Sequence, residues 1–293
     1  MKVSGRDLAD KILEKLKLEI KGKNLTLCLA IILASNDPAP KMYTQRKINV
    51  AGEIGIKATL YEFSENQGQD CFETIQQLNE DQNIHGIIVQ QPMHTGWDFQ
   101  KYIQVVSSKK DVDGFKEDSP YKEATALGVW EMLSEFGRIE GFKSTDEFLE
   151  GKKIVVLGKG LTAGKPTINL LTEKGFPPEV IDSKTENPNQ IIKNADVVIS
   201  ATGKKNIING GNIKKGSFVI GIGVGKEEKD GEERIFGDIN EEEIKDIAKL
   251  YCPTIGGIGP LTIACLLKNV MEASFTAQGP VSSVSQSRSS TQA

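Results

Sequence analysis

Short apolar runs alternate with helix-like patterns along the first 90 residues of the chain. The runs are rich in β-branched residues, which favours strands, and the apolar residues between them recur at helical spacing. Strands are predicted over residues 25–33, 56–63 and 84–89, and helices over about 5–20, 40–53 and 71–78. Strands and helices that alternate at these lengths predict an α/β fold with a parallel sheet.

The pattern starts again near residue 152 and predicts a second lobe. Residues 125–136 look helical and are expected to bridge the lobes. Further strands are predicted over 154–157, 180–182, 197–201 and 218–222. The charged stretch 226–234 indicates a solvated turn or hairpin, and 256–274 indicates a glycine-rich turn with an apolar helix that returns to the first lobe.

These elements divide the chain into an N-terminal α/β lobe, residues 1–122, and a Rossmann-type lobe with a parallel sheet, residues 123–256. A C-terminal helix, 257–276, is expected to complete the first lobe, and a cleft is expected between the lobes. Residues 277–293 are rich in serine, glutamine and small residues, so they are expected to be disordered.

Three glycines follow the predicted strand 154–157, and Pro166 then opens a helical pattern. Gly158, Gly160 and Gly164 permit a sharp turn that lets an anion approach the main chain, and the start of a helix offers free N–H groups. The spacing GxGxxxG differs from the usual dinucleotide fingerprint GxGxxG. It favours nucleotide binding but leaves an ordinary turn between strand and helix open.

Composition argues against several classes of protein. The net charge of −4 argues against a general nucleic-acid binder, and no apolar run approaches the roughly 20 residues that span a bilayer. The polar N-terminus lacks the apolar core of a signal peptide, so a cytoplasmic protein with reduced thiols is expected. The cysteines and histidines show no metal-binding spacing. No metal, nucleic acid or membrane partner is therefore expected.

Three residues of the first lobe are suited to proton transfer or ligand binding. Tyr43 and Lys47 lie four residues apart on a predicted helix, so their side chains point the same way. A tyrosine can stack on a flat ring, and desolvation lowers the pKa of a lysine enough for proton exchange near neutral pH. Gln90 follows a predicted parallel strand, at the edge where ligands of α/β sheets bind. Spacing alone also allows a surface Tyr–Lys pair and a glutamine that only binds a loop.

Asp111 and Asp113 alternate around Val112. In an extended segment they face opposite sides, so both cannot serve one site. Gly114 predicts a tight turn that fixes the Asp113 carboxylate, which could bind a ligand or could only cap the turn.

Six motifs, in order, carry a resemblance to a known family. They are Tyr43-x-x-x-Lys47, Gly86-Ile-Ile-Val-Gln90-x-Pro92, Lys110-Asp-Val-Asp113-Gly-Phe115, Gly158-x-x-x-x-x-Gly164-Lys-Pro166, Ser183-Lys-Thr185 and Gly256-Gly-x-Gly-Pro260-x-Thr262. Over residues 1–274 the chain resembles the bifunctional methylenetetrahydrofolate dehydrogenase/cyclohydrolases. Each motif alone is unspecific, but the six together in this order are highly specific.

The resemblance implies a role for each of these side chains. Tyr43 would stack on the folate, and Lys47 would assist proton transfer and water attack. Gln90 would hold Lys47, and Asp113 would bind the polar edge of the pterin-like ring. Further folate contacts are implied for Val89, Gln91, Gly256, Gly257, Gly259, Pro260 and Thr262. Dinucleotide contacts are implied for Gly158, Lys159, Gly160, Gly164, Ser183, Thr202 and Val224.

The resemblance also implies two reactions. Methylene-tetrahydrofolate would be oxidised to the methenyl form by hydride transfer to NAD(P), and water would then add to the methenyl carbon to give formyl-tetrahydrofolate. The first lobe would bind the folate substrate and the second the dinucleotide, and the family suggests a homodimer through the second lobe.

Cofactor choice depends on three charged residues. Members of the family often have Arg-Ser after the first glycine to bind the 2′-phosphate of NADP, and the resemblance implies that Lys159-Gly160 keeps this cation and loses the hydroxyl. Asp182, at the end of a predicted strand, favours the free ribose of NAD. Lys184 could offset the repulsion from Asp182. NADP is the predicted cofactor, with NAD as the alternative.

Several positions depart from the family pattern. Pro40 stands where a serine is usual, and Ile255 where a proline is usual. Lys116-Glu117 replaces His-Pro, and Ala124-Thr125-Ala126 stands in place of Pro-Cys-Thr-Pro. These changes bear on the balance of the two activities.

Two other functions stay open at this point. One is a two-lobe NAD(P)-dependent dehydrogenase that acts on another pterin or a small acid, which would not need Gln90 and Asp113 together with Lys47. The other is a non-catalytic nucleotide-binding relative. Such a protein is expected to have lost the catalytic lysine, but this chain retains Lys47.

Overall fold

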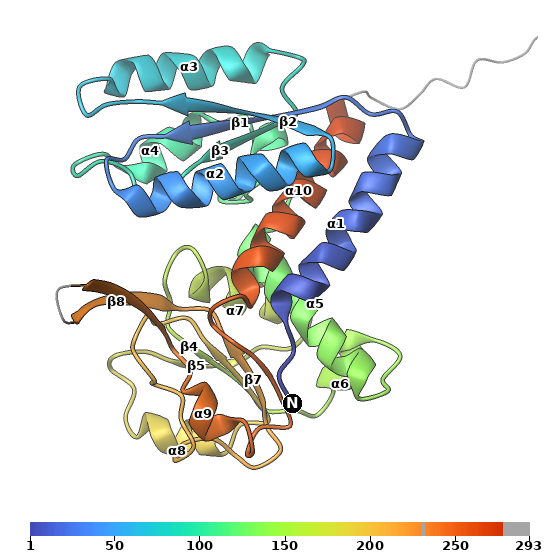
Figure 1. Cartoon of the computed structure of the whole chain (residues 1–293), viewed down its shortest axis with the longest axis vertical. Coiled ribbons are helices and arrows are strands. Elements are labelled where there is room, and N and C mark those ends of the chain that lie inside the picture. The colour runs from blue at the N-terminus through green and yellow to red at the C-terminus, as the bar shows by residue number, and fades with distance from the viewer. Residues whose placement is uncertain (230–231, 278–293) are drawn as a thin grey trace, which may run out of the picture.

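The computed structural model describes residues 1–229 and 232–277, and these form two α/β lobes joined by long helices (Figure 1). The first lobe has a parallel sheet in the order β2-β1-β3. Its strands are β1 (Leu27–Leu33), β2 (Ile56–Glu62) and β3 (Gly86–Val89), and its helices are α2 (Pro38–Glu53), α3 (Gly68–Glu80), α4 (Phe99–Val105) and the 3-10 helix η1 (Ser108–Lys110). Helices α3 and α4 cover one face of the sheet, and α2 covers the other.

Local capping decides where the first helices begin. Ser4 caps α1 (Gly5–Gly22), and its hydroxyl accepts a hydrogen bond from the Asp7 N–H at 3.2 Å. Helix α2 begins at Pro38, two residues before the predicted start, because the Asp37 side chain accepts from the Ala39 N–H at 2.9 Å. The earlier start gives α2 a complete first turn before Tyr43.

The second lobe is a five-stranded parallel sheet in the order β10-β7-β6-β4-β5. Its strands are β4 (Ile154–Leu157), β5 (Glu179–Ile181), β6 (Val197–Ser200), β7 (Phe218–Gly221) and β10 (Leu250–Cys252), and its helices are α6 (Thr145–Leu149), α7 (Gly164–Glu173), α8 (Pro188–Lys193) and α9 (Glu241–Ile244). The N-terminal residues run beside β10, where the Val3 N–H donates to the Tyr251 carbonyl at 2.8 Å.

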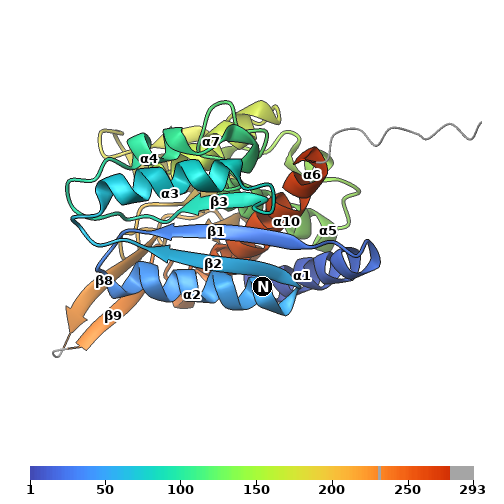
Figure 2. The same ribbon diagram turned by 90° about the horizontal axis from the view of Figure 1, so that it is seen from above.

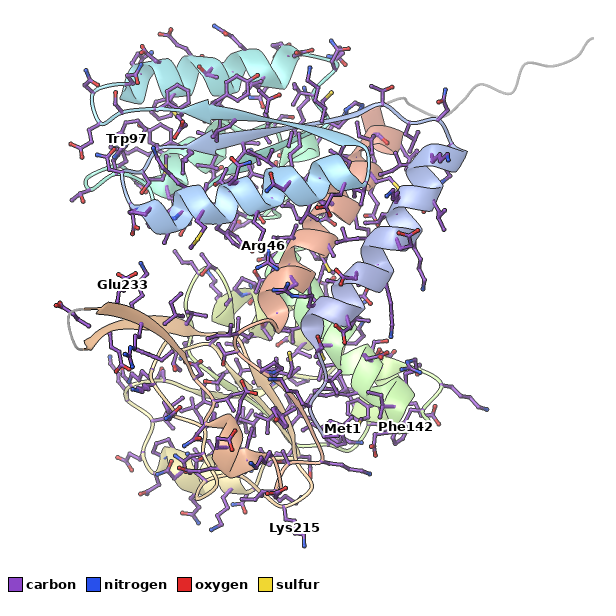
Figure 3. The ribbon with its side chains drawn as sticks, viewed as in Figure 1. Met1, Arg46, Trp97, Phe142, Lys215 and Glu233 are labelled. Atoms are coloured by element: carbon purple, nitrogen blue, oxygen red, sulfur yellow. The ribbon has the colours of Figure 1, made fainter. Side chains whose placement is uncertain are left out.

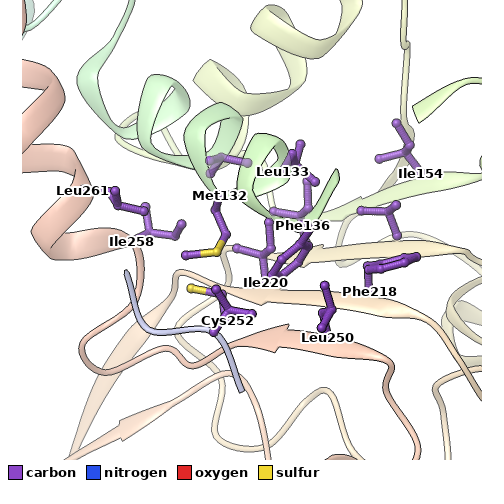
Figure 4. Close-up of a cluster of buried hydrophobic side chains, with 14 of the residues drawn as sticks. Met132, Leu133, Phe136, Ile154, Phe218, Ile220, Leu250, Cys252, Ile258 and Leu261 are labelled. Carbon is purple, nitrogen blue, oxygen red and sulfur yellow. The ribbon is translucent and has the colours of Figure 1, made fainter. Parts of the chain in front are cut away.

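Helices α1, α5 (Ala124–Ile139) and α10 (Ile258–Ala277) connect the lobes. A Cβ on Gly128 of α5 would lie 3.1 Å from the Leu261 Cβ of α10, so these two helices pack closely. Figure 4 shows Met132, Phe136 and Leu261 over the strands of the second sheet. Further along, α10 packs on β1 of the first lobe.

An antiparallel hairpin projects from the second lobe (Figure 2). It consists of β8 (Val224–Lys229) and β9 (Glu232–Gly237), and within the described residues these strands pair only with each other. Of the two predictions for the stretch 226–234, the hairpin is confirmed.

The predicted strands are confirmed to within two residues at their ends, and the parallel α/β class is confirmed. Elements α4, α6, α8, α9 and β10 were not predicted, and all of them have seven residues or fewer. The division at residues 122 and 256 stays a prediction, since the first three residues lie against the second sheet. The tail 277–293 lies, after Ala277, outside the described residues.

All four cysteines are free, in agreement with the predicted reduced thiols. None of the helices in the described ranges combines the length and apolar character that crossing a bilayer requires. In the same ranges, no group of three His, Cys, Asp or Glu residues is arranged to hold a metal ion.

Candidate active site

Lys47 is the centre of a buried polar cluster in the first lobe. Helical spacing on α2 brings Tyr43 to the same side, and the Lys47 Nζ lies 5.0 Å from the centroid of the Tyr43 ring. The Lys47 side chain donates a hydrogen bond to the Gln90 Oε1 at 3.0 Å, and Lys47 is only 4% exposed. We call Tyr43, Lys47, Gln90 and Asp113 the Lys47 cluster.

Gln90 is held in place by its own main chain and by its neighbour. Its N–H donates to the Ile32 carbonyl at 2.9 Å, which continues the β1–β3 pairing, and its Nε2 donates to the Gln91 carbonyl at 2.6 Å. The Oε1 is thereby aimed at Lys47. The preceding Val89 packs its side chain into the core under α3 and α4, so only its main chain is available to a ligand.

Asp111 and Asp113 have different roles. The turn is fixed by Asp111, whereas the sequence had associated the turn with Asp113. Asp111 is fully buried, and its carboxylate accepts from the Gly114 N–H at 3.2 Å and the Lys116 N–H at 2.8 Å. Gly114 has a φ of +77°, as a tight turn requires. The turn therefore leaves the half-buried Asp113 carboxylate to act on Lys47. The prediction that the two side chains do not serve one site is in agreement with this arrangement.

Burial shifts the protonation equilibria of the cluster toward neutral forms. Desolvation lowers the pKa of Lys47, and the negative charge of Asp113 partly offsets this by raising it. Desolvation raises the pKa of Asp113, and the charge of Lys47 partly lowers it again. Burial, and secondarily Asp113, also raises the pKa of Tyr43. A lysine with a lowered pKa and a fixed hydrogen-bond acceptor can exchange a proton with a ligand.

Two charged residues beside the cluster were missed by the sequence analysis. Glu123 is half-buried at the start of α5, and burial, together with the charge of Asp113, raises its pKa. Arg46 is exposed on the side of α2 nearest the second lobe (Figure 3), and its guanidinium forms no hydrogen bond or ion pair within the described ranges. The only sequence signal for Arg46 was its position between Tyr43 and Lys47.

The glycine turn of the second lobe leaves no space for side chains at two positions. A Cβ on Gly158, whose φ is +94°, would lie 2.5 Å from the Ala201 carbonyl oxygen, and one on Gly164 would lie 2.2 Å from the Gly158 carbonyl oxygen. At Gly160, by contrast, a Cβ would meet no protein atom within 4 Å. The turn is therefore closed on the protein side and open where a ligand could approach the main chain.

Lys159 and Asp182 form an ion pair at the same edge. The Lys159 Nζ lies 2.8 Å from Asp182 Oδ2, and the Lys184 N–H donates to Oδ1 of the same carboxylate at 2.9 Å. The hydrogen bond from Lys159 is the main cause that lowers the pKa of Asp182 to about 2. Ser183 lies between these residues in the turn. We call residues 158–164, 182–185 and 200–204 the glycine edge.

The remaining predicted residues lie in three places. Thr202 belongs to the glycine edge, but its hydroxyl donates to Asp238 at 3.0 Å and so is directed into the lobe. Val224 begins β8 and is exposed. Gly256, Gly257, Gly259, Pro260 and Thr262 form the entry to α10. Within the described residues, no hydrogen bond or ion pair joins this entry to the Lys47 cluster.

Comparison with known proteins identifies relatives of both lobes. Residues 3–113 match the family model of the tetrahydrofolate dehydrogenase/cyclohydrolase catalytic domain, and residues 123–278 match that of its NAD(P)-binding domain. The bifunctional protein FolD of Caldanaerobacter subterraneus subsp. tengcongensis is 34% identical over 273 residues, which are 93% of this chain and 96% of that protein.

Solved structures agree with this match. The bifunctional methylenetetrahydrofolate dehydrogenase/cyclohydrolase FolD of Campylobacter jejuni has a TM-score of 0.84 and 30% identity, and the match covers 94% of this chain and 99% of that one. The corresponding Trypanosoma brucei enzyme, complexed with NADP cofactor and an inhibitor, has a TM-score of 0.85 and 25% identity, and the match covers 95% and 98% of the two chains.

Proposed function

Because this chain belongs to the tetrahydrofolate dehydrogenase/cyclohydrolase family, we propose that the Lys47 cluster serves both reactions of the enzyme. The enzyme oxidises methylene-tetrahydrofolate to methenyl-tetrahydrofolate with NADP, and it hydrolyses the methenyl form to formyl-tetrahydrofolate. The observation that carries the proposed site is the buried Lys47, fixed by Gln90 at 3.0 Å and facing the charge of Asp113.

In the oxidation step, the cluster orients the folate. Tyr43 stacks on the flat part of the substrate, and Asp113 accepts hydrogen bonds from the polar edge of the pterin-like ring. NADP, when bound, accepts the hydride that leaves the one-carbon bridge. A methenyl cation forms on the substrate, and the lowered pKa of Lys47 reduces the positive charge beside it.

In the hydrolysis step, Lys47 handles a proton. Its neutral amine assists water as the water attacks the methenyl carbon, and the ring then opens to the formyl compound. Gln90 keeps the amine in one position, since its own amide is tied to the Gln91 carbonyl. We assign Val89, Gln91 and the segment containing Gly256, Gly257, Gly259, Pro260 and Thr262 to the walls of the folate site.

The residues at the glycine edge fit a dinucleotide phosphate. The free space at Gly160 and the start of the ten-residue helix α7 offer main-chain N–H groups and a positive dipole end. Lys159 offers a cation for the 2′-phosphate of NADP, although it is paired with Asp182. Gly158, Gly164, Ser183, Thr202 and Val224 complete the proposed contact set.

The two other functions explain fewer of the observations. A dehydrogenase for a different pterin or a small acid gives no reason for the buried hydrogen bond between Lys47 and Gln90 beside Asp113. A non-catalytic nucleotide-binding protein gives no reason for a lysine with a lowered pKa. The folate enzyme accounts for all of these features together.

We also propose a cytoplasmic homodimer that forms through the second lobe. The free thiols support the compartment. The β8–β9 hairpin supports the dimer, because Val224 and Ile235 are each 52% exposed on strands that pair only with each other within the described chain. Light scattering of Ile235→Lys against the natural protein tests this, and an unchanged mass would reject the hairpin as the dimer contact.

An absorbance assay for methenyl-tetrahydrofolate tests the function. Purified protein is given methylene-tetrahydrofolate with NADP or with NAD in separate reactions, and hydrolysis of the methenyl form is followed without dinucleotide. We expect the methenyl compound to form when NADP is supplied. In the separate hydrolysis assay, we expect the methenyl form to disappear faster with the protein than without it. Failure of both reactions would overturn the proposal.

A further inference from the structure

A buried carboxylate, Asp238, lies directly behind the glycine edge. It is 0% exposed and follows β9. Its Oδ2 accepts from the Ser200 hydroxyl at 2.7 Å and the Thr202 N–H at 2.8 Å, and its Oδ1 accepts from the Thr202 hydroxyl at 3.0 Å and the Lys204 N–H at 3.0 Å. All four donors are uncharged groups of residues 200–204, which run from the last residue of β6 into the loop that follows it. Among the ion pairs of the described residues, none includes Asp238.

A buried carboxylate without a cation is costly, so its contacts must compensate. Here, within the described residues, each carboxylate oxygen accepts hydrogen bonds from residues 200–204 only, and two of the donors are main-chain N–H groups. The loop follows β6, and its main chain turns through Gly203, whose φ is +66°. The carboxylate therefore determines the shape of this loop.

The loop lies against the glycine turn. A Cβ on Gly158 would lie 2.5 Å from the Ala201 oxygen and 3.5 Å from the Thr202 Cγ2. On the other side, a Cβ on Gly223 would lie 2.3 Å from the Gly203 nitrogen and 2.4 Å from the Asp238 Oδ2. The chain segments around Asp238 are thus closely packed, where the ends of β4, β6 and β7 meet.

The strand order makes this place a ligand site. From β4 the chain passes to β5, which pairs with one edge of β4, and then to β6, which pairs with its other edge, so the carboxyl ends of β4 and β6 flank a switch point. Ligands of open α/β sheets bind at such crevices. Residues 200–204 continue from the end of β6 and the glycine turn follows β4, so both lie at this switch point.

We propose that Asp238 is a positioning residue for the dinucleotide: it fixes the main chain of residues 202–204 so that this loop faces the ligand at the β4–β6 crevice. The proposal deepens the proposed function and rests on it only for the identity of the ligand. It also changes how Thr202 is expected to contact the dinucleotide. The Thr202 hydroxyl donates to Asp238, so the contact would come from the Thr202 main chain.

The substitution Asp238→Asn tests this with almost no change in shape. Each carboxylate oxygen accepts from one main-chain N–H, and an N–H cannot rotate to become an acceptor. Whichever way the asparagine amide turns, its NH₂ group faces the N–H of either Thr202 or Lys204. One of these two groups must therefore lose its acceptor, and the loop must shift.

Asp196→Asn is the matched control in the same lobe. Asp196 lies at the opposite end of β6, where it accepts from the Lys153 N–H at 2.9 Å and from Lys214 Nζ at 2.5 Å. It also ties a loop to the sheet, but at the edge away from the crevice. We expect the Kd of NADP, measured by calorimetry, to rise about tenfold in Asp238→Asn and to stay within about twofold in Asp196→Asn.

The kinetic pattern separates positioning from general damage. In Asp238→Asn the KM for NADP should rise about tenfold, while kcat at saturating NADP and the KM for the folate change by less than about threefold. Equal NADP affinity in Asp238→Asn and the natural protein would overturn the inference. Absence of NADP binding by the natural protein would instead overturn the dinucleotide part of the proposed function.

A milder variant covers the case in which Asp238→Asn does not fold. Ser200→Ala removes one donor to Oδ2 and leaves both main-chain donors in place. It should raise the Kd of NADP by about threefold, with a melting temperature close to that of the natural protein. An unchanged Kd in a folded Ser200→Ala protein, with Asp238→Asn unfolded, would count against the inference.

Discussion

The Lys47 cluster and the glycine edge hold their charged groups in opposite ways. Lys47 is 4% exposed, and burial moves its pKa down and that of Asp113 up. At the glycine edge, the side chain of Lys159 is 57% exposed and that of Asp182 33%, and their pairing moves the pKa of Asp182 down instead. Desolvation dominates in the first region and direct pairing in the second.

This difference separates chemistry from binding. A buried lysine with a lowered pKa can give and take a proton, but it needs a rigid partner such as Gln90. A phosphate needs main-chain N–H groups and space, which Gly158, Gly160 and Gly164 provide through backbone shape. Changes at the two regions should therefore have different consequences for rate, affinity and salt dependence.

Removing the lysine should have the largest effect. Lys47→Met deletes the proposed proton-transfer group and should lower cyclohydrolase activity by about 10²- to 10⁴-fold. The fold should survive, since an amine that burial already drives toward its neutral form is replaced by an apolar chain of similar length, and burial also favours the neutral form of the remaining Asp113 carboxyl. Activity is followed as loss of methenyl-tetrahydrofolate absorbance, and folding by thermal unfolding.

Lys41→Met is the control for this variant. Lys41 lies on the same helix but is exposed, and it pairs with Glu62 at 3.1 Å. Its replacement should leave the rate within about twofold, because exposed pairs contribute little. Normal hydrolysis by Lys47→Met would remove Lys47 from the mechanism and, with it, the contrast between the two regions.

Closing the glycine turn should affect the other region alone. A methyl group on Gly164 would lie 2.2 Å from the Gly158 oxygen, so Gly164→Ala must distort the turn. Strain of this kind should weaken NADP binding roughly 10- to 100-fold and leave hydrolysis of the methenyl substrate nearly unchanged. Calorimetry with NADP and the dinucleotide-free hydrolysis assay measure the two effects.

Gly160→Ala sharpens this test. Within the described protein, nothing would touch the new methyl group, so the fold should not change. Any loss of NADP affinity in this variant reports contact with the ligand itself. A parallel loss of hydrolysis in Gly164→Ala would show that the two regions are not independent.

The sequence predicted strands such as β4 and β6 because their residues are buried on both faces and form apolar runs. It missed β10, which has only three residues. The GxGxxxG spacing indicated the turn, but the reason for Gly164 is a contact with Gly158 that only the folded chain defines. Local patterns thus reveal elements better than they reveal contacts between elements.

The candidate site was predicted unevenly for the same reason. Tyr43 and Lys47 share a helix, so their proximity follows from spacing, whereas the hydrogen bond from Lys47 to Gln90 joins two distant segments and came from family resemblance. Alternation separated Asp111 from Asp113 without showing which one fixes the turn. Asp238 gave no signal, because its four donors lie 34 to 38 residues away in the chain.

Removing the charge of Asp113 from the Lys47 cluster should change the pH dependence of the hydrolysis rate. The Asp113 carboxylate raises the pKa of Lys47, so Asp113→Asn should let that pKa fall further. The neutral amine then forms at lower pH, and the acidic limb of the hydrolysis rate should move down by about one pH unit. The rate is measured at saturating substrate over roughly pH 5 to 9, a range that includes the ordinary operating range of such groups. A limb that stays in place, or moves up, would mean that the neutral form of Lys47 does not set the rate.

Removing one charge from the exposed region should have the smallest effect, and salt should reduce it. Asp182→Asn frees Lys159 from its partner at 2.8 Å and removes a negative charge that would repel the 2′-phosphate. The ratio of NADP to NAD affinity should therefore rise about fivefold, and Lys159→Glu should lower it by a similar factor, since exposed charges interact through water. In about 0.5 M salt both changes should shrink, because screening acts within a few ångströms there. The Lys47 variants should show no such salt dependence. If Asp182→Asn left the ratio unchanged, the pair would be a surface contact with no part in cofactor choice; if its effect resisted salt, the glycine edge would be as shielded from water as the Lys47 cluster.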